Sequence, residues 1–413
     1  MALVLQELTL SALAYGGDAL GHLDDGRAAF VPFGLPGERV RIALAEEKER
    51  FVRGKLVEVL EPAPERVAPR CKHFGVCGGC HYQHMPYEAQ LLAKTEILRD
   101  QLVRIGHIVS PPLQPAVPSP SQWNYRNHVQ FHLTGDGSLG YVTTGIRKGS
   151  PAQVFAIEEC HLPEASIDAL WPRLDFDAGA GIERIGIRSG SHDELLVVLE
   201  TVFPNAPELQ IIEGISVSQL LGADCRTLAG DDHVVLGVLG REFRVSAAAF
   251  FQVNKAMAGK MVEHVLGHAP TSIGTLLDVY CGVGLFSAFL AGRCKRLIGV
   301  ESSPAACRDF AVNLDEFDNV ELYEDAAERA LPALKLDADV VLVDPPRAGV
   351  GRAALDAIIR MEPRMLIYVS CDPATLARDA RRLTEAGLRL AEARAFDLFP
   401  QTYHIESISI FER

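Results

Sequence analysis

The sequence predicts a multidomain protein with a small N-terminal β-barrel, a mixed α+β central part and a C-terminal α/β domain built on a doubly wound parallel sheet. Three observations predict this division. Residues 1–62 combine a two-residue apolar alternation with closely spaced turns, residues 71–80 hold a cysteine cluster, and strand and helix patterns alternate from residue 248 to the end. Because 413 residues exceed what one core usually serves, we expect domains at 1–62, 63–247 and 248–413.

In the N-terminal part, Val40, Ile42 and Leu44 alternate with Arg39 and Arg41, which is the period of a half-buried strand. Glycine or proline pairs at residues 16–17 and 36–37 separate several such runs as turns. Short strands at this spacing favour a small β-barrel, which ends at a proline-containing linker at residues 61–64.

The central part begins with the cysteines and continues with a helical pattern over about residues 87–106, a helix that we expect to pack on the C-terminal domain. Closely spaced prolines between residues 111 and 120 predict an irregular connection. From residue 123 to about 240 the pattern is mostly strand-like.

Composition and charge narrow the function classes. The formal net charge of −14 opposes indiscriminate binding to nucleic acid, but screening beyond roughly 8–10 Å still allows a local basic site. No apolar run is long enough to span a bilayer and the N-terminus lacks a signal-peptide pattern, so we expect a cytoplasmic protein with no membrane partner. In that reducing compartment the nine cysteines are not expected to form a disulfide framework.

A glycine-containing loop follows the first predicted strand of the C-terminal domain. The segment D-V-Y-C-G-V-G at residues 278–284 lets the backbone turn tightly and approach a ligand. Glu301 ends the next strand, where a carboxylate can accept hydrogen bonds from two ribose hydroxyls. The segment D-P-P-R at residues 344–347 follows a later buried strand and reaches the same edge of the sheet. These positions favour a nucleotide or S-adenosylmethionine over a simple tight turn.

Two further residues are candidates for catalysis. Cys371, in S-C-D-P after the strand pattern M-L-I-Y-V, is expected to face the ligand crevice. A thiol there acts as a nucleophile if a general base lies nearby, and Glu406 near the C-terminus is the candidate base. Each residue also has a plain structural interpretation, a small buried thiol for Cys371 and a solvated strand residue for Glu406.

The cysteines at the start of the central part suggest a metal site. Cys71, Cys77 and Cys80 form a C-x5-C-x2-C cluster, and Cys160 is the best fourth partner. Four thiolates bind either zinc or an iron–sulfur cluster. A zinc ribbon normally carries two C-x2-C pairs, and here a single distant cysteine replaces one pair, which favours [4Fe-4S] over zinc. The C-x3-C-x2-C spacing of radical enzymes is absent.

These motifs occur together in one known family. GGDALGHLDDGRAAFVPFGLPGERVRI resembles a TRAM domain, an OB-like RNA-binding barrel, and CKHFGVCGGCHYQH with the later IEEC resembles a cluster-binding region. SAAAFFQVN, DVYCGVGLF, Glu301, DPPRAG, SCDP and HIE follow in the family's order. Over nearly its whole length the chain resembles the bacterial RNA (uracil-5-)-methyltransferases, especially the iron–sulfur members that act on 23S ribosomal RNA. The resemblance implies an iron–sulfur central domain and a Rossmann-like methyltransferase domain at 248–413.

The resemblance also implies a role for each site residue. Cys371 is the expected nucleophile and Glu406 the expected proton-abstracting base. The expected S-adenosylmethionine ligands are Gln252, Tyr280, Gly282, Glu301, Asp325 and Asp344. The expected [4Fe-4S] ligands are Cys71, Cys77, Cys80 and Cys160. Two positions depart from the family: Leu285 replaces a small polar residue and is not expected to contact the cofactor, and Asp372 replaces an asparagine beside the thiol, where we expect its charge to point away.

Uracil chemistry accounts for this catalytic pair. Carbon 5 of uracil is a weak nucleophile until a thiolate adds to carbon 6 and converts the ring to an enolate. The methylated adduct then needs a base that removes the proton from carbon 5, so that the thiolate can leave. The expected function is transfer of a methyl group from S-adenosylmethionine to carbon 5 of a uridine in structured RNA, through a covalent adduct of Cys371.

RNA contacts are expected from basic and aromatic residues of the first two domains. Barrel cations that could follow phosphates are Arg39, Arg41, Arg50, Arg53 and Lys55. Stacking and charge in the central part are expected from Trp123, Tyr125, Arg126, Arg147 and Lys148. The expected partner is 23S ribosomal RNA, bound by a monomer.

Other functions fit parts of the sequence. A tRNA uracil-5-methyltransferase shares these motifs. An RNA cytosine-5-methyltransferase usually carries a proline-cysteine motif where this chain has D-P-P-R, and an amino-group methyltransferase usually has an aromatic residue at the position of Arg347. A non-catalytic RNA-binding assembly factor has no need of Cys371, Glu406 and Glu301 together.

Overall fold

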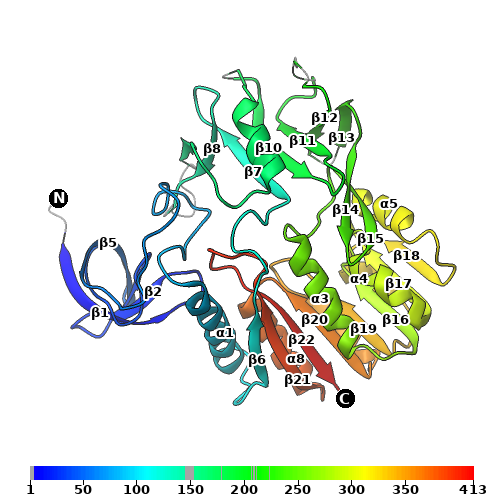
Figure 1. Ribbon diagram of the computed structural model, residues 1–413. Coiled ribbons are helices and arrows are strands. Elements are labelled where there is room, and N and C mark those ends of the chain that lie inside the picture. The colour runs from blue at the N-terminus through cyan, green and yellow to red at the C-terminus, as the bar shows by residue number, and fades with distance from the viewer. Residues whose placement is uncertain are drawn as a thin grey trace.

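The computed structural model describes residues 4–144, 153–177, 179–205, 207, 210, 212–222 and 224–413, so the predicted RNA contacts Arg147 and Lys148 lie outside the described residues. Figure 1 shows three parts: an N-terminal barrel at one side, a central sheet at the top, and an α/β domain that carries the C-terminus. None of the helices in the described part of the chain combines the length and apolar character needed to cross a membrane.

The N-terminal part is a closed barrel, as the two-residue alternation predicts. Its strands follow the order β1-β2-β3-β5-β4 and span β1 (Leu5–Leu13), β2 (Ala19–His22), β3 (Ala28–Val31), β4 (Arg39–Glu47) and β5 (Phe51–Glu61). Of the apolar members of the alternation, Val40 and Ile42 are fully buried in the barrel core, and Leu44 is partly buried against it. Gly54 allows a close approach there, because a Cβ at that position would lie 2.5 Å from Cδ1 of Ile42.

The central part is a mixed sheet with the order β13-β12-β11-β10-β7-β8-β9 among the described residues. Its strands are β7 (His128–Leu133), β8 (Leu139–Val142), β9 (Val154–Ala156), β10 (Ile182–Ser189), β11 (Leu195–Thr201), β12 (Ile215–Leu221) and β13 (Asp224–Ala229). The short helix α2 (Ala165–Leu170) packs Ile167 and Leu170 against this sheet in one core cluster with Phe131 and Ile185. A separate hairpin follows, formed by β14 (His233–Val238) and β15 (Arg241–Ser246).

The C-terminal part is a larger sheet with the order β18-β17-β16-β19-β20-β22-β21-β6. Its strands are β6 (Leu113–Val117), β16 (Ile273–Val279), β17 (Cys294–Glu301), β18 (Val320–Glu324), β19 (Val340–Val343), β20 (Met365–Ser370), β21 (Arg389–Phe396) and β22 (Glu406–Glu412). The pairs from β18 to β20 are all parallel, as predicted. The prediction of a wholly parallel sheet is wrong for β22, which runs antiparallel to both β20 and β21.

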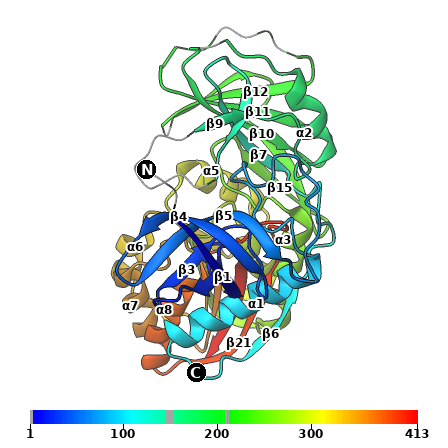
Figure 2. The same ribbon diagram turned by 90° about the vertical axis from the view of Figure 1, so that its left-hand side faces the viewer.

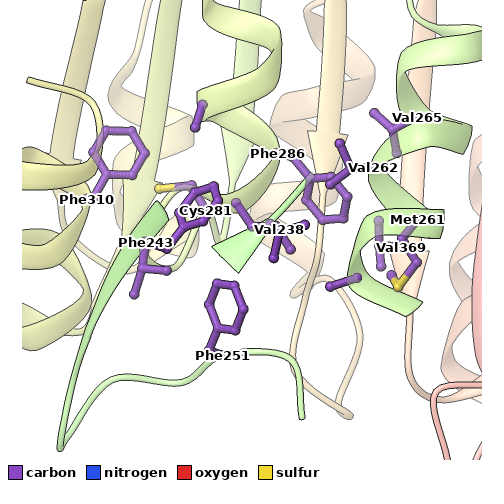
Figure 3. Close-up of a cluster of buried hydrophobic side chains, with 14 of the residues drawn as sticks. Val238, Phe243, Phe251, Met261, Val262, Val265, Cys281, Phe286, Phe310 and Val369 are labelled. Atoms are coloured by element: carbon purple, nitrogen blue, oxygen red, sulfur yellow. The ribbon is translucent and has the colours of Figure 1, made fainter. Parts of the chain in front are cut away.

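Helices cover both faces of this sheet. One face packs against α3 (Lys255–His268), α4 (Leu285–Leu290) and α5 (Pro304–Asn313). The other packs against α1 (Tyr87–Arg104), α6 (Ala327–Ala333), α7 (Arg352–Arg360) and α8 (Pro373–Glu385). Figure 3 shows the first of these cores, in which Val238, Phe243, Val262, Cys281 and Phe286 lie together. The β14–β15 hairpin therefore belongs to the core of the C-terminal domain.

The chain enters the C-terminal domain before it builds the central sheet. Helix α1 packs on α8, as expected, through Ile97 and Leu98. The segment whose prolines predicted an irregular connection contains β6, which pairs with β21 at the edge of the sheet. An edge strand can carry prolines because one of its sides needs no backbone donors.

The sheet order creates a ligand-binding point between β16 and β19. The chain runs from β16 out to β17 and β18 and then returns to β19 on the other side of β16. In open α/β sheets, ligands bind outside the carboxyl ends of the strands where the order reverses in this way. The glycine loop at residues 280–284 follows β16, and Asp344 follows β19, so both reach this point.

The barrel rests against the C-terminal domain rather than standing apart from it. In Figure 2 the barrel faces the viewer and lies in front of the C-terminal domain, below the central sheet. The hydroxyl of Tyr15, just after β1, donates a 2.6 Å hydrogen bond to Oδ2 of Asp372 at the start of α8. A small apolar cluster that includes Leu35 of the barrel, Tyr82 and Met85 extends this contact.

Candidate functional site

Carboxylates surround the glycine loop at the point where the strand order reverses. Oε2 of Glu301 accepts a 3.0 Å hydrogen bond from the N–H of Gly282, while its Oε1 accepts bonds of 2.7 Å from the N–H groups of Ser302 and Ser303. Gly282 has a φ of 55°, and a Cβ there would meet no atom within 4 Å. The loop thus exposes bare backbone to open space beside a fixed negative charge.

Asp278 and Asp344 add two more acids at this edge. Burial, together with the neighbouring carboxylates, raises the pKa of each to about 7. Oδ2 of Asp278 accepts a 2.6 Å hydrogen bond from the hydroxyl of Ser287, but its buried Oδ1 has no partner. A buried carboxylate oxygen without a donor is costly, so this site suits a ligand that carries positive charge.

The other predicted cofactor residues lie around the same loop or at its margin. Tyr280 has a φ of 62° and donates a 3.0 Å hydrogen bond from its hydroxyl to Glu328. Asp325 follows β18 and forms an ion pair with Arg329. Gln252 is buried in the segment before α3, and its backbone oxygen accepts a 3.0 Å bond from the amide of Asn127.

Cys371 and Glu406 lie at the facing ends of two paired strands. Cys371 follows β20, Glu406 begins β22, and the antiparallel register sets Ser370 opposite Ser407. Cys371 directly follows one of these serines and Glu406 directly precedes the other, so both residues lie at this edge of the sheet, and Glu406 influences the thiol electrostatically. Asp344 lies at the same edge, because β19 and β20 are parallel neighbours with Val343 opposite Tyr368.

Negative neighbours oppose ionisation of this pair in the ligand-free protein. Burial, Glu406 and Asp344 together raise the pKa of the Cys371 thiol to about 12. Burial and Asp344 also hold the pKa of the Glu406 carboxyl well above its usual range. The Arg347 guanidinium acts in the opposite direction on both groups. A cationic ligand near Asp344 would weaken the field that keeps the thiol protonated.

Arg347 is held beside the pair by a neutral histidine. Its Nη2 lies 3.4 Å from Nδ1 of His404. Burial, together with Arg347 and other cations, lowers the pKa of His404 to about 3, so the uncharged ring accepts this hydrogen bond.

The charge of Asp372 is directed away from the thiol. Oδ1 accepts hydrogen bonds of 3.0 and 2.9 Å from the N–H groups of Ala374 and Thr375, which caps the N-terminus of α8. Oδ2 accepts the bond from Tyr15. Asp372 accordingly raises the pKa of the Cys371 thiol less than Glu406 and Asp344 do.

The predicted cluster ligands line a separate cavity of about 170 Å³. Cys71, Cys77, Cys80 and Cys160 all contribute to its wall. Burial and the neighbouring thiols raise the pKa of Cys77 to about 11 and that of Cys80 to about 12. Four protonated thiols in this geometry lose their protons to solvent most readily when a cation binds the sulfurs.

The cysteine sulfurs are more widely spaced than zinc requires. In the described part of the chain, three ligand atoms come within 4.8 Å of one another only at His264, His268 and Glu392, and at no group of cysteines. Zn–S bonds of about 2.3 Å in a tetrahedron would bring the sulfurs to about 3.8 Å. The arrangement therefore suits a larger occupant than a single zinc ion.

Arg126 forms part of the wall of the cysteine cavity. Its buried Nε has no hydrogen-bond partner, and its charge lowers the pKa of both Cys80 and Cys160. The guanidinium also lies 5.6 Å from the ring centroid of Phe399. A guanidinium beside four thiols favours their thiolate forms, which are the forms that bind a metal ion or a cluster.

The loop between β21 and β22 joins this cavity to the candidate base. The N–H groups of His81 and Tyr82, which follow the last clustered cysteine, both donate to the backbone oxygen of Gln401, at 2.9 and 3.0 Å. The hydroxyl of Tyr125 donates a 3.1 Å bond to the oxygen of Pro400. The position of residues 397–404 therefore depends on the cysteine segment.

Helix α1 holds the same loop from the other side. Nζ of Lys94 donates to Oδ1 of Asp397 at 2.5 Å and to the oxygen of Phe399 at 3.0 Å. Lys94 and Asp397 are 1% and 0% exposed, so this ion pair is fully desolvated. The side chain of Gln90 both donates to and accepts from Gln401.

Only some of the side chains predicted to contact RNA are exposed. Tyr125 is 5% exposed and its hydroxyl is bonded, so the expectation that it stacks on RNA is wrong. The side chain of Arg126 lines the cysteine cavity. Trp123 remains partly exposed, with the guanidinium of Arg70 at 5.2 Å from its ring centroid.

Most of the barrel cations are neutralised by carboxylates on neighbouring strands. Arg39 and Arg41 pair with Glu7, Glu58 and Glu61, and Arg53 pairs with Asp18. Arg50 and Lys55 are exposed, and within the described residues they form no ion pair. These two cations are the ones left to meet phosphates.

Comparison with known proteins assigns the chain to a family. A sequence profile described as tRNA (Uracil-5-)-methyltransferase matches residues 230–413, and one described as TRAM domain matches residues 5–57. An uncharacterized RNA methyltransferase of Thermosynechococcus vestitus is 32% identical over 98% of this chain and 97% of its own length. The chain belongs to the RNA uracil-5-methyltransferase family. It is thereby an S-adenosylmethionine-dependent enzyme that methylates RNA.

Two further relatives match this chain over nearly its whole length. An uncharacterized RNA methyltransferase of Aquifex aeolicus is 32% identical and covers 98% of each chain. The solved structure of a Pyrococcus abyssi tRNA (uracil-54, C5)-methyltransferase in complex with S-adenosyl-L-homocysteine is 24% identical, with a TM-score of 0.75 over 98% of this chain and 100% of that one. The whole three-part fold is therefore shared with a solved methyltransferase.

Some residues of the site were missed in the sequence. Asp278 opens the D-V-Y-C-G-V-G segment but was not named as a ligand, although an acid inside a buried strand was a visible signal. Tyr15 could not be found, because no local pattern links it to Asp372 across the whole chain.

Proposed function

Within this family, we propose that Cys371 adds to carbon 6 of a uridine and that Glu406 removes the proton from carbon 5 after methyl transfer. One observation carries the proposal: Cys371 directly follows Ser370 and Glu406 directly precedes Ser407, and these two serines are paired in the β20–β22 ladder, next to the strand that leads to Asp344. Covalent catalysis at uracil needs a nucleophile and a base at one ring.

The proposed steps conserve atoms and charge. The thiol of Cys371 loses its proton to water, and the thiolate forms a bond to carbon 6 while the C5=C6 electron pair moves into the 4-carbonyl. Carbon 5 of this enolate takes the methyl group from a sulfonium, which leaves as a neutral thioether. The Glu406 carboxylate takes the proton from carbon 5, the C5=C6 bond re-forms and the thiolate leaves. Arg347, beside the pair, offsets the negative charge that develops.

The acid-lined loop supports the binding of S-adenosylmethionine. The proposed ligands are Gln252, Tyr280, Gly282, Glu301, Asp325 and Asp344, with Asp278 added. The methyl donor carries an ammonium and a sulfonium, which suit the buried carboxylates, and two ribose hydroxyls, which suit Glu301. The open space above Gly282 lets the ligand approach the backbone closely.

We further propose that Cys71, Cys77, Cys80 and Cys160 hold a [4Fe-4S] cluster. The volume of the cavity and the wide spacing of the sulfurs support an occupant larger than one metal ion, and the Arg126 guanidinium would offset the negative charge of the four thiolates around it. The cluster would fix the segment that bonds Gln401, and so the loop that leads to Glu406. Methyl transfer is a polar reaction, so the cluster contributes structure and no electrons.

Metal analysis of anaerobically purified protein tests the cluster. We expect about four iron and four sulfide per chain, and a loss of most of the iron in Cys80→Ser. One zinc per chain, in place of iron, would overturn the assignment.

We propose 23S ribosomal RNA as the substrate, bound by a monomer. The combination of a TRAM barrel with a cysteine cavity supports this choice. Transfer RNA is the second candidate, favoured by the description of the matching profile and by the tRNA enzyme that shares the fold.

Tritium release from RNA labelled at carbon 5 of its uridines tests both reaction and substrate. We expect release from unmodified 23S ribosomal RNA with S-adenosylmethionine present, and none with Cys371→Ala, which should still bind the methyl donor. Release from transfer RNA alone would correct the substrate. Turnover by Cys371→Ala would overturn the covalent mechanism.

A further inference from the structure

A second group of metal-ligating side chains lies on the methyltransferase domain, away from the active site and from the cysteine cavity. His264 and His268 are one turn apart on α3, and Glu392 lies on the adjacent strand β21. Nε2 of His264 is 3.2 Å from Oε1 of Glu392, and Nε2 of His268 is 3.5 Å from Oε2. Neither histidine nor Glu392 is used in the proposed reaction.

The positions of the two histidines follow from helix geometry. Figure 3 shows that Met261, Val262 and Val265 of α3 point into the core. Residues four apart lie on one helix face, so His264 and His268 form a second stripe beside this buried one. Two histidines at this spacing on one face are a recurrent zinc-binding arrangement.

A β-bulge aims Glu392 at that stripe. The pairing of β21 with β22 shifts by one residue between Leu390 and Glu392, so Ala391 is an extra residue. Leu390 packs in the core on the far face, whereas Ala391 packs in the core that contains α3. The bulge thus changes the direction of the following side chain.

The three side chains present lone pairs to one another. Nδ1 of His268 lies 2.9 Å from the backbone oxygen of His264, an acceptor, so Nδ1 is the donor nitrogen and Nε2 is the ring nitrogen left to bind an ion. Nε2 of His264 and Oε1 of Glu392 are buried without a hydrogen-bond partner, despite their proximity. A cation between them would satisfy both.

We propose that His264, His268 and Glu392 bind a divalent first-row transition metal ion such as Zn²⁺. Zinc bonds of about 2.0–2.2 Å in a tetrahedron separate the ligand atoms by about 3.4 Å. The two histidine nitrogens lie 3.2 and 3.5 Å from the two oxygens of the Glu392 carboxylate, and one ligand atom from each of the three residues lies within 4.8 Å of the others, so a small inward movement would complete the site. The Nδ1–H bond of His268 to a backbone oxygen is the kind of contact that orients metal-binding histidines. His268 is 31% exposed, so the fourth position opens to water.

The residues around the proposed site indicate the role of the bound ion. The site lies at the C-terminal end of α3, where unpaired carbonyls favour a cation. Arg394 is the opposing charge, and its Nε is bonded to the oxygen of Pro115. An ion here would clamp α3, which follows Gln252, to β21, which leads into the loop before Glu406. Its role is to join two segments of the domain, and no reaction step passes through it.

Cobalt binding tests the site without confusion with the cysteines. Co²⁺ is titrated into the anaerobic holoprotein and followed by its visible spectrum, with Zn²⁺ added in competition. We expect d–d bands of a nitrogen–oxygen site without the strong near-ultraviolet band of thiolate ligation. Glu392→Gln and His268→Ala should weaken binding at least tenfold. The control is His192→Ala, which removes an exposed histidine that lies 2.6 Å from Glu242 and should change nothing.

Each of these measurements either supports or overturns the proposed metal site. His268→Ala removes a part-exposed side chain, so it remains informative if His264→Ala does not fold. Unchanged affinity in His268→Ala and Glu392→Gln overturns the proposal. A thiolate band, or an equal loss in His192→Ala, overturns it as well, because the ion then sits elsewhere.

Discussion

At the scale of single residues, the proposed reaction depends on when the Cys371 thiol ionises. Burial of the Cys371 side chain and the negative charges of Glu406 and Asp344 favour the protonated thiol, and the Arg347 guanidinium opposes them. A thiol this weakly acidic reacts only slowly with electrophiles in solution. Its activation therefore depends on positive charge that arrives with the ligands, which would restrict attack to the assembled complex.

We expect Cys371 to react with iodoacetamide far more slowly than a free thiol. At pH 8 a thiol of pKa about 8.5 is about a quarter ionised, and one near 12 only about one part in 10⁴. Between pH 8 and 10 the alkylation rate of Cys371 should rise about 100-fold, which peptide-resolved mass spectrometry can follow. A rate at pH 8 equal to that of glutathione would contradict the raised pKa.

The Glu406→Gln variant should alkylate faster at alkaline pH, where the wild-type Glu406 carboxyl is ionised, because the substitution then removes a negative neighbour of the thiol. Asp372→Asn is the matched control. Its carboxylate caps α8 and bonds Tyr15, so its removal should change the rate little.

The same Glu406→Gln variant should trap the enzyme on its RNA. Addition and methyl transfer can proceed without a base, but the proton on carbon 5 then has no acceptor and the thiolate cannot leave. We expect a covalent protein–RNA band on a denaturing gel that requires Cys371. Normal turnover without such a band would assign the base to another residue.

Much of the residue-scale site could be predicted because it consists of short motifs at strand ends. D-V-Y-C-G-V-G, Glu301, Asp344 and Cys371 each follow an apolar run that marks a buried strand. No short motif after an apolar run points to Glu392. Only a bulge in β21 turns it toward α3, and bulges leave no periodic signal.

At the scale of elements, the loop between β21 and β22 positions the candidate base. It is held by the cysteine segment through Gln401, by Tyr125 through Pro400, and by α1 through the buried pair of Lys94 and Asp397. Each of these partners lies far away in sequence. Sequence patterns predicted the strands and α1, but not that they meet at this loop, since long-range pairing has no local period.

We expect Lys94→Met to destabilise the protein by about 3–5 kcal/mol, because it leaves the Asp397 carboxylate buried and unpaired. Differential scanning calorimetry at fixed pH measures the change. Replacing both partners, as in Lys94→Met with Asp397→Leu, should recover part of the loss.

The control is an exposed ion pair of the same domain. Arg296 and Glu321 are each 46% exposed, and Arg296→Met should cost less than about 1 kcal/mol. Equal losses in Lys94→Met and Arg296→Met would mean that burial of the Lys94 pair has no energetic consequence.

The edge strands show where sequence patterns fall short. The prolines around β6 predicted an irregular connection, yet an edge position tolerates them. The reversed direction of β22 was also not foreseen, since an apolar run has the same appearance whichever way it pairs.

At the scale of the whole molecule, charge is distributed so that RNA binding must be local. The net charge is −14, and most cations of the barrel are paired with carboxylates. Long-range attraction to phosphate is therefore weak, and affinity has to come from the few unpaired cations that touch the RNA.

The salt dependence of RNA binding measures those contacts. Arg50→Ala should lower the slope of log affinity against log salt by about one, because Arg50 forms no ion pair among the described residues. Arg39→Ala, whose guanidinium is held by Glu7 and Glu61, should leave the slope unchanged. An equal fall for both variants would show that RNA displaces the carboxylates.

The place of β22 between β20 and β21 also makes the proposed catalytic pair depend on completion of the sheet. The strand Glu406–Glu412 joins the parallel strands to the pair formed by β21 and β6. Until β22 pairs with both neighbours, the sheet is divided in two and Glu406 has no fixed position beside Cys371. The proposed nucleophile and the proposed base therefore meet only in the fully assembled sheet, so a partly folded chain has the thiol but no active pair.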